Sequence, residues 1–176
     1  MPHHSAFAIP VASLDIMVID DSDSMRRLYR TCLTSFGIAN PRMFDSVLSA
    51  LDAMADLPPD LVIVDWRMGP PSGIDFLTRM RSVDSGAACL TAAIMVTGHG
   101  SEAFVKRAMR AGAQQFLVKP VSPRLLYERI NWLTMDGREL VRDGKHYVIE
   151  GVEERLKWHE CFVAETPDQA RDVVEL

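Results

Sequence analysis

The strongest constraint on the fold comes from four short, largely apolar runs, each followed at once by a charged or hydroxyl-bearing residue. The runs cover residues 14–19, 61–64, 92–96 and 115–118. Apolar runs without regular polar alternation are typical of strands that are covered on both faces, as in a parallel sheet. A fifth strand is expected near residues 42–44, where the pattern is weaker. The sequence therefore predicts a buried parallel sheet.

Helical patterns separate these runs. Apolar residues recur at steps of three and four over residues 24–36, 47–57, 74–80, 102–111 and 123–133. The first helix has a serine N-cap, Ser22 or Ser24, and a stop signal at Gly37. Because strand and helix alternate five times, we expect a doubly wound α/β fold with helices on both faces of the sheet.

Polar residues stand at the carboxyl ends of the predicted strands: Asp20, Asp21, Asp65, Thr97 and Lys119. In an open parallel sheet these ends share one edge, where ligands bind. We therefore expect residues that are far apart in the sequence to converge there.

The residue types at this edge suit phosphoryl transfer. Three neighbouring carboxylates repel one another unless a cation lies among them, and Mg²⁺ prefers such hard oxygen ligands. Lys119 adds an ammonium group and Thr97 a hydroxyl. Asp65 is the expected nucleophile because it stands alone, whereas Asp20 and Asp21 are adjacent. The product would be an aspartyl phosphate.

Five motifs in this chain resemble the receiver domain of two-component response regulators, most closely the chemotaxis regulators. They are IDDSDSMRR at 19–27, VIVDWRM at 62–68, Gly73, VTG at 96–98 and FLVKP at 116–120. The motifs occur in the family's order, and the resemblance spans residues 14–135. It implies a flavodoxin-like sheet of five parallel strands in the order 2-1-3-4-5.

The resemblance implies a metal and phosphoryl site. Asp65 matches the phosphoacceptor, Asp21 the direct Mg²⁺ ligand and Asp20 the carboxylate that supports the metal through water. The backbone carbonyl of Arg67 matches a third ligand. The implied metal set is therefore Asp20, Asp21, Asp65 and Arg67.

Three further positions match residues that respond to phosphorylation in this family. Thr97 resembles the switch hydroxyl, Phe116 the aromatic residue that turns inward, and Lys119 the phosphate-binding ammonium group. The bond between Lys119 and Pro120 is expected to be cis.

The chain also departs from the family pattern. Gly69 replaces the proline that usually follows the methionine, and two prolines come after it, so a differently turned loop is expected. Arg67 and His99 occupy positions that influence phosphoryl lifetime in this family.

The sequence before the first predicted strand differs in character from the sequence after the last predicted helix. Residues 1–13 are expected to be a flexible N-terminus. Residues 136–176 form an extension too short for an ordinary output domain. An Asp-Gly turn predicts a hairpin over 140–149, and the TPDQ sequence at 166–169 predicts the start of a short helix. The extension is expected to support a homodimer or to cover the last two receiver helices, with a loosely attached acidic tail as the alternative.

Charge and composition argue against several classes of protein. The formal net charge is -5, with nineteen basic and twenty-four acidic residues, so binding to nucleic acid is not expected. The longest apolar run, 87–96, is about half the length needed to span a bilayer, and no membrane insertion is expected. Three cysteines without CxxC spacing indicate free thiols and a cytoplasmic protein.

The sequence thus predicts a phosphoacceptor signalling protein rather than an enzyme. A histidine kinase or a histidine phosphotransfer protein would donate the phosphoryl group, and a downstream protein would read the changed surface. One alternative is a haloacid-dehalogenase-like phosphatase that uses Asp21-Ser22-Asp23, although Met25 fits it poorly and Asp65 would have no role. The other is a scaffold receiver that is never phosphorylated.

Overall fold

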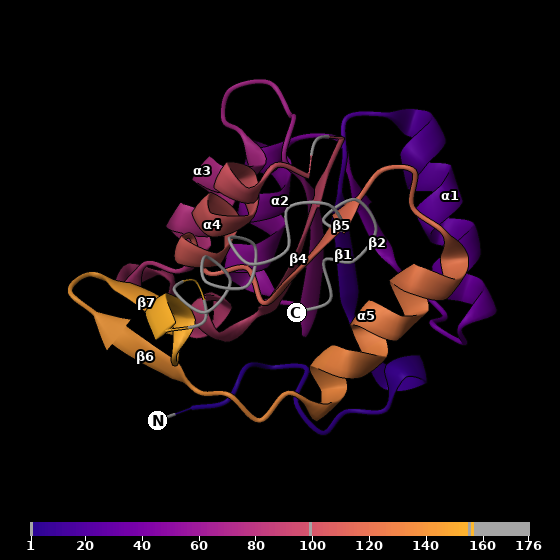
Figure 1. Cartoon of the computed structure of the whole chain (residues 1–176). Coiled ribbons are helices and arrows are strands. Elements are labelled where there is room, and N and C mark those ends of the chain that lie inside the picture. The colour runs from indigo at the N-terminus through magenta and orange to yellow at the C-terminus, as the bar shows by residue number, and fades with distance from the viewer. Residues whose placement is uncertain (1, 99, 155, 157–176) are drawn as a thin grey trace, which may run out of the picture.

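The computed structural model describes residues 2–98, 100–154 and 156. Strands and helices alternate along the chain and are followed by a hairpin (Figure 1). The α/β part contains β1 (Ile16–Ile19), α1 (Asp23–Ser35), β2 (Arg42–Phe44), α2 (Val47–Asp56), β3 (Leu61–Asp65), α3 (Gly73–Met80), β4 (Ala92–Thr97), α4 (Glu102–Arg110), β5 (Gln115–Val118) and α5 (Pro123–Met135). A stretch of 3-10 helix, Val83–Leu90, precedes β4 and was not predicted from the sequence.

The five strands form one parallel sheet in the order β2-β1-β3-β4-β5, which confirms the predicted topology. Ile19 of β1 lies beside Val64 of β3, and Asp65 lies beside Val96 of β4. The strands therefore end at a common edge. Helices α1 and α5 cover one face of the sheet, and α2, α3 and α4 cover the other (Figure 1).

Alternate residues of each central strand enter two separate hydrophobic cores. In β1, Met17 and Ile19 pack on the side of α2, α3 and α4, whereas Ile16 and Val18 pack on the side of α1 and α5. All four side chains are fully buried. Burial on both faces explains why these runs show no polar alternation in the sequence.

Local signals set the limits of α1. The Ser22 hydroxyl accepts a hydrogen bond from the Met25 N–H at 3.4 Å, and Asp23 lies in the first turn, where a negative charge is favourable. Gly37 follows the helix with a φ of +91°, a left-handed conformation that glycine adopts without strain. The predicted cap and stop of this helix are confirmed.

The N-terminal segment contacts distant parts of the chain. The Ser5 N–H donates to the Leu90 carbonyl at 2.8 Å, His3 forms a β-bridge with Glu139, and Ala6 and His4 are buried. A short 3-10 helix, Val11–Ser13, leads into β1. The described residues 2–13 therefore make specific contacts with the rest of the chain, although only His4 and Ala6 among them are buried. The flexibility expected for this segment stays a prediction.

The predicted hairpin is present as β6 (Leu140–Asp143) and β7 (His146–Ile149). A two-residue loop starts with Gly144 at a φ of +58°. The Tyr147 N–H donates to the Arg81 carbonyl at 2.8 Å, and the Val83 N–H donates to the Lys145 carbonyl at 3.0 Å. The hairpin therefore packs on its own chain. The predicted helix that starts near residue 166 lies outside the described residues.

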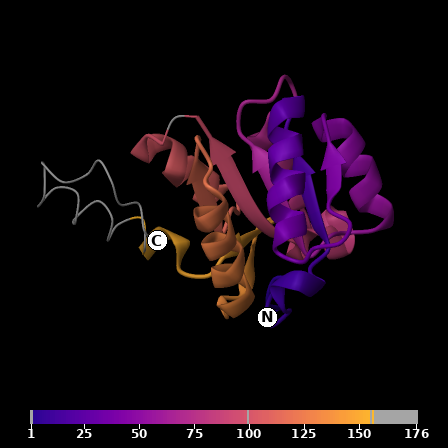
Figure 2. The same ribbon diagram turned by 90° about the vertical axis from the view of Figure 1, so that its right-hand side faces the viewer.

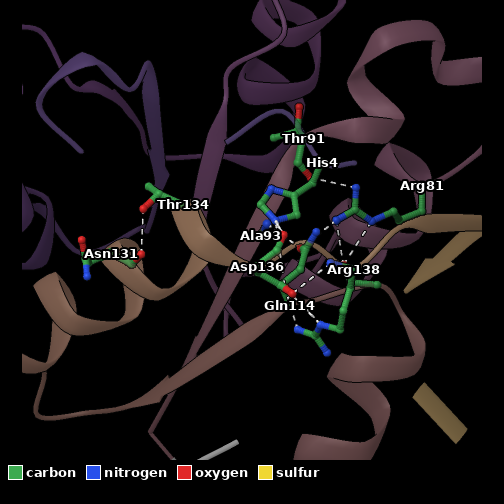
Figure 3. Close-up of polar contacts among 10 residues, drawn as sticks. His4, Arg81, Thr91, Ala93, Gln114, Asn131, Thr134, Asp136 and Arg138 are labelled. Atoms are coloured by element: carbon green, nitrogen blue, oxygen red, sulfur yellow. Dashed lines mark hydrogen bonds and ion pairs between the residues drawn. The ribbon is translucent and has the colours of Figure 1, made fainter. Parts of the chain in front are cut away.

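Figures 1 and 2 place the N-terminal segment and the hairpin together at the end of the sheet opposite the carboxyl ends of the strands. Two buried charged groups lie there (Figure 3). Arg81 donates to four neutral acceptors, and Asp136 forms a bidentate ion pair with Arg138 at 2.8 Å. His4 contacts the Asp136 backbone carbonyl at 3.1 Å, and burial lowers the pKa of His4 to about 4. His4 is therefore a neutral packing residue near pH 7.

None of the helices in the described ranges is long and apolar enough to cross a lipid bilayer.

Candidate functional site

An acidic cluster lies at the carboxyl edge of the sheet. Asp20 and Asp21 directly follow β1, and Asp65 is the last residue of β3. Each offers a carboxylate oxygen within 4.8 Å of the others. Asp20 and Asp65 are only 1% and 5% exposed, whereas Asp21 faces solvent. The structure thus brings the three predicted carboxylates together.

Lys119 binds two of these carboxylates. Its Nζ atom lies 3.0 Å from Asp20 Oδ2 and 2.9 Å from Asp65 Oδ2. Burial by itself lowers the pKa of Lys119, but hydrogen bonds to the two carboxylates and their charges outweigh it and raise that pKa above its usual value. The ammonium group is therefore held in its charged form between two buried anions.

Local hydrogen bonds orient Asp20. Its Oδ1 atom accepts from the Ser22 N–H at 2.9 Å, and the Arg26 guanidinium donates to its backbone carbonyl at 2.7 Å. Burial raises the pKa of the Asp20 carboxyl above its ordinary value, although Ser22 and Lys119 act in the opposite direction. Ionised Asp20 is therefore less favourable inside the fold than in water.

This raised pKa predicts that Asp20→Asn stabilises the metal-free protein. A group whose pKa is raised by folding contributes stability below its unfolded pKa and loses that contribution as the pH rises through the folded value. Asparagine mimics the protonated carboxyl, so we expect about 0.5–2 kcal/mol of added stability at pH 7, decreasing toward zero near pH 4. Urea unfolding with a chelator present measures this difference. Asp52→Asn, on the exposed side of α2, is the matched control and should change stability by less than about 0.5 kcal/mol. If the stability gained by Asp20→Asn increased toward acid pH, the prediction would be contradicted.

Thr97 and Phe116 come from the neighbouring strands β4 and β5. Thr97 is buried at the end of β4, and its carbonyl accepts from the Lys119 N–H at 2.8 Å. Phe116 is buried in the core that also contains Val105 and Met109 of α4. The bond between Lys119 and Pro120 is cis, as is the bond between the two prolines at 70 and 71.

Arg67 lies in the loop that follows Asp65. The Arg67 N–H donates to Asp65 Oδ1 at a long 3.4 Å, and the Trp66 N–H extends the sheet ladder to the Val96 carbonyl at 2.7 Å. The predicted lifetime position His99 lies outside the described residues.

Trp66 makes contacts that sequence reasoning did not identify. Its ring meets the Phe104 ring edge to face, with the centroids 4.9 Å apart, and the Arg107 guanidinium lies 5.5 Å from its centroid. Both partners belong to α4 and are three residues apart, on one face of the helix. These contacts join sequence-distant elements, so no local pattern could have indicated them.

Gly73 allows α3 to start against the backbone of Asp65. A Cβ atom at Gly73 would overlap the carbonyl oxygen of Asp65 and would lie 3.2 Å from the Cα atom of Trp66. The Gly73 N–H also donates to the Trp66 carbonyl at 3.3 Å. Close approach of two backbone segments explains this glycine.

We expect Gly73→Ala to destabilise the protein by about 1–3 kcal/mol and to disturb the site, because backbone atoms rather than flexible side chains must move. Gly69→Ala, in the loop that leads into α3, is the matched control, since no described atom lies within 4 Å of its added Cβ. Urea unfolding of both variants measures the difference. Equal stability of the two variants would show that the contact at Gly73 relaxes without cost.

An open parallel α/β sheet with an acidic cluster and a lysine at its carboxyl edge is the arrangement expected of a receiver domain. The family model of the response regulator receiver domain matches residues 16–131. The chain belongs to this family.

Individual relatives agree with this assignment. The chain is 33% identical over 120 residues to the chemotaxis protein CheY1 of Helicobacter pylori, covering 66% of this chain and 94% of the relative. It is 28% identical over 116 residues to the chemotaxis protein CheY of Thermotoga maritima, covering 66% and 93%.

Solved structures share the fold. The chemotaxis response regulator CheY4 of Vibrio cholerae has a TM-score of 0.62 at 24% identity, over 68% of this chain and 97% of that one. A two-component response regulator of the LuxR family from Aurantimonas has a TM-score of 0.64 at 21% identity, over 84% and 98%.

Proposed function

We propose that this chain accepts a phosphoryl group on Asp65 and signals through the resulting change in its contacts with other proteins. The observation that carries the proposal is the cluster in which buried Asp65 binds Lys119 at 2.9 Å and lies beside Asp20 and Asp21. Membership of the receiver family supports the same role. Asp65 is the proposed nucleophile because it ends a central strand at the sheet edge, where a ligand can approach.

The donor set of the cluster fits Mg²⁺. Asp20, Asp21 and Asp65 offer only carboxylate oxygens, which are the hard ligands that this ion prefers, and the exposed Asp21 leaves the cluster open to solvent. Together with the backbone carbonyl of Arg67 they are the residues proposed to hold the ion. When bound, Mg²⁺ supplies positive charge that neutralises phosphoryl oxygens.

In the proposed reaction, a carboxylate oxygen of Asp65 attacks the phosphorus of a phosphohistidine. A P–O bond forms, the P–N bond breaks, and the imidazole leaves with the bonding electron pair and takes up a proton. The Lys119 ammonium neutralises charge on the phosphoryl oxygens, and the Thr97 hydroxyl lies at the adjacent strand end as a hydrogen-bond donor. Positioning and charge neutralisation are the main contributions of the protein.

The proposed phosphoryl donors are a histidine kinase or a histidine phosphotransfer protein. The proposed target of the phosphorylated chain is a downstream protein. Phe116 is the proposed aromatic switch residue. Its side chain is already buried, in contact with the core beneath α4. A change in the packing of Phe116 would therefore reach the surface formed by α4 and β5.

The test is incubation of the full chain with Mg²⁺ and acetyl phosphate, followed by mass spectrometry of the intact protein and its peptides. We expect one added phosphoryl group on Asp65, and none in Asp65→Asn or after chelation of Mg²⁺. Asp52→Asn, exposed on α2, should be labelled like the unmodified chain. Labelling of Asp21 would favour the phosphatase alternative, and the absence of any label would favour the scaffold alternative; either result would overturn the proposal.

A further inference from the structure

Helix α4 contacts the loop beside the proposed phosphoacceptor. Phe104 and Arg107 of α4 both contact the ring of Trp66, with 4.9 Å between the two ring centroids and 5.5 Å from the guanidinium carbon to the Trp66 centroid. Trp66 directly follows Asp65 in the chain, so its backbone moves with that of the acceptor. Edge-to-face and cation–π contacts of this kind each contribute a modest attraction and fix the relative orientation of the groups.

The other end of α4 contacts the C-terminal extension. The Arg110 guanidinium donates to both carboxylate oxygens of Glu153, at 2.9 and 3.2 Å. Val152 and Leu156, only 5% and 4% exposed, belong to the same core as the buried face of α4. These residues follow the hairpin, which is itself fixed to the Arg81 carbonyl. The residues after β7 are therefore linked to α4 by a surface ion pair and by a shared hydrophobic core.

A phosphoryl group on Asp65 would act on the first of these contacts. It adds about 1.5 to 2 negative charges and three acceptor oxygens. The Arg67 N–H already lies near Asp65 Oδ1 at 3.4 Å, so the loop that carries Trp66 must adjust to supply donors to the new oxygens. The Arg107 guanidinium, held over the Trp66 ring, is also attracted to the added negative charge. Because α4 is close-packed against the sheet, a displacement at one end is transmitted to the other.

We propose that α4 couples the Asp65 site to the C-terminal extension, so that phosphorylation displaces α4 through Trp66 and loosens the contacts of Val152, Glu153 and Leu156. This inference rests on the proposed phosphoacceptor function and identifies the extension as the part of the chain that changes with it. Coupling between two sites is reciprocal. Weakening the contacts of the extension should therefore favour the phosphorylated state.

Hydrogen exchange of the full chain, measured by mass spectrometry with and without acetyl phosphate and Mg²⁺, tests the coupling. The peptide that contains Val152 and Glu153 should exchange roughly 5-fold faster or more in the phosphorylated protein. Phe104→Leu removes the ring contact with Trp66 and should abolish this acceleration while leaving Asp65 labelled. Arg124→Gln breaks another exposed ion pair, with Glu128 on α5, and it should retain the full acceleration.

A second arm measures the reciprocal effect. Val152→Ala should raise the phosphorylated fraction at a fixed, subsaturating acetyl phosphate concentration, with a shift in the labelling equilibrium of roughly 5-fold. If Asp65 is labelled but the exchange rate is unchanged, or if Phe104→Leu retains the acceleration, the coupling is overturned and the proposed function stands. If Asp65 is not labelled at all, both fall together.

Discussion

Arg81→Met is expected to lower the free energy of unfolding by about 3–5 kcal/mol. Arg81 is 1% exposed and donates five hydrogen bonds. Figure 3 shows Arg81 with two of its acceptor residues, Thr91 and Gln114. The acceptors are the carbonyls of Gly112 (3.1 and 2.8 Å), Cys89 (2.6 Å) and Thr91 (2.7 Å) and the side-chain oxygen of Gln114 (3.0 Å). These bonds join the ends of α3 and α4 to the segment before β4.

The size of this effect follows from what methionine leaves behind. Burial lowers the pKa of Arg81 to about 10, so the side chain is still charged at neutral pH. Methionine fills a similar length without a donor and leaves three backbone carbonyls in the interior unbonded. Each unsatisfied buried group costs about 1–3 kcal/mol, and removing a buried charge offsets part of the total.

Arg79→Met is the matched control, because Arg79 is exposed on the same helix two residues earlier. It should change stability by less than about 0.5 kcal/mol. Urea unfolding of both variants at pH 7 measures the difference. If Arg81→Met unfolds at the same urea concentration as the control, the buried guanidinium contributes no net stability.

The sheet could be predicted from the sequence because its central strands are buried on both faces. Residues 61–64 are apolar without interruption and fully inside the fold, so composition alone indicates their environment. The environment of Arg81 could not be predicted in this way. An arginine at the end of a helical pattern is usually exposed, and only the tertiary structure brings four acceptors to its guanidinium.

The N-terminal segment shows the same limit. His4 becomes buried because the start of the extension supplies Asp136 as a partner, 132 residues later. No periodic pattern in residues 2–13 indicates this contact. Burial there is decided by long-range packing, which local propensity does not encode.

The carboxylate cluster could be predicted because the topology itself brings strand ends together. Asp20, Asp65 and Thr97 need only follow parallel strands of one sheet to meet at its edge. The contact of Trp66 with Phe104 depends instead on the directions of two side chains, one in a loop and one on a helix, that are 38 positions apart in the sequence. The chemistry of the site was therefore predictable, whereas its connection to α4 was not.

Lys119→Met is expected to lower the free energy of unfolding by about 2–4 kcal/mol at pH 8 and to prevent stable phosphorylation. Lys119 is the cation that contacts both Asp20 and Asp65, at 3.0 and 2.9 Å, and methionine removes its charge while keeping the side chain's length. Two buried carboxylates are then left side by side without it. Repulsion between the two carboxylates and their separation from water both disfavour the folded state in which both are ionised.

The pH dependence of this variant has a definite sign. Burial raises the pKa of Asp20 even when Lys119 is present, and removing the cation raises it further. A carboxyl whose folded pKa is raised contributes stability at low pH and loses it as the pH increases. The deficit of Lys119→Met should therefore shrink as the pH falls from about 8 toward 5, as followed by urea unfolding without Mg²⁺.

A double variant distinguishes the loss of the Lys119 ion pairs from the loss of the packing of its side chain. In Asp20→Asn/Lys119→Met one buried carboxylate is neutral, so repulsion with Asp65 is removed and the amide of the new asparagine can donate a hydrogen bond. We expect the double variant to be about 1–3 kcal/mol more stable than the sum of the two single changes. If the two changes in the free energy of unfolding are additive, the Lys119 side chain stabilises the edge of the sheet by packing instead, because removal of a carboxylate then brings no compensation.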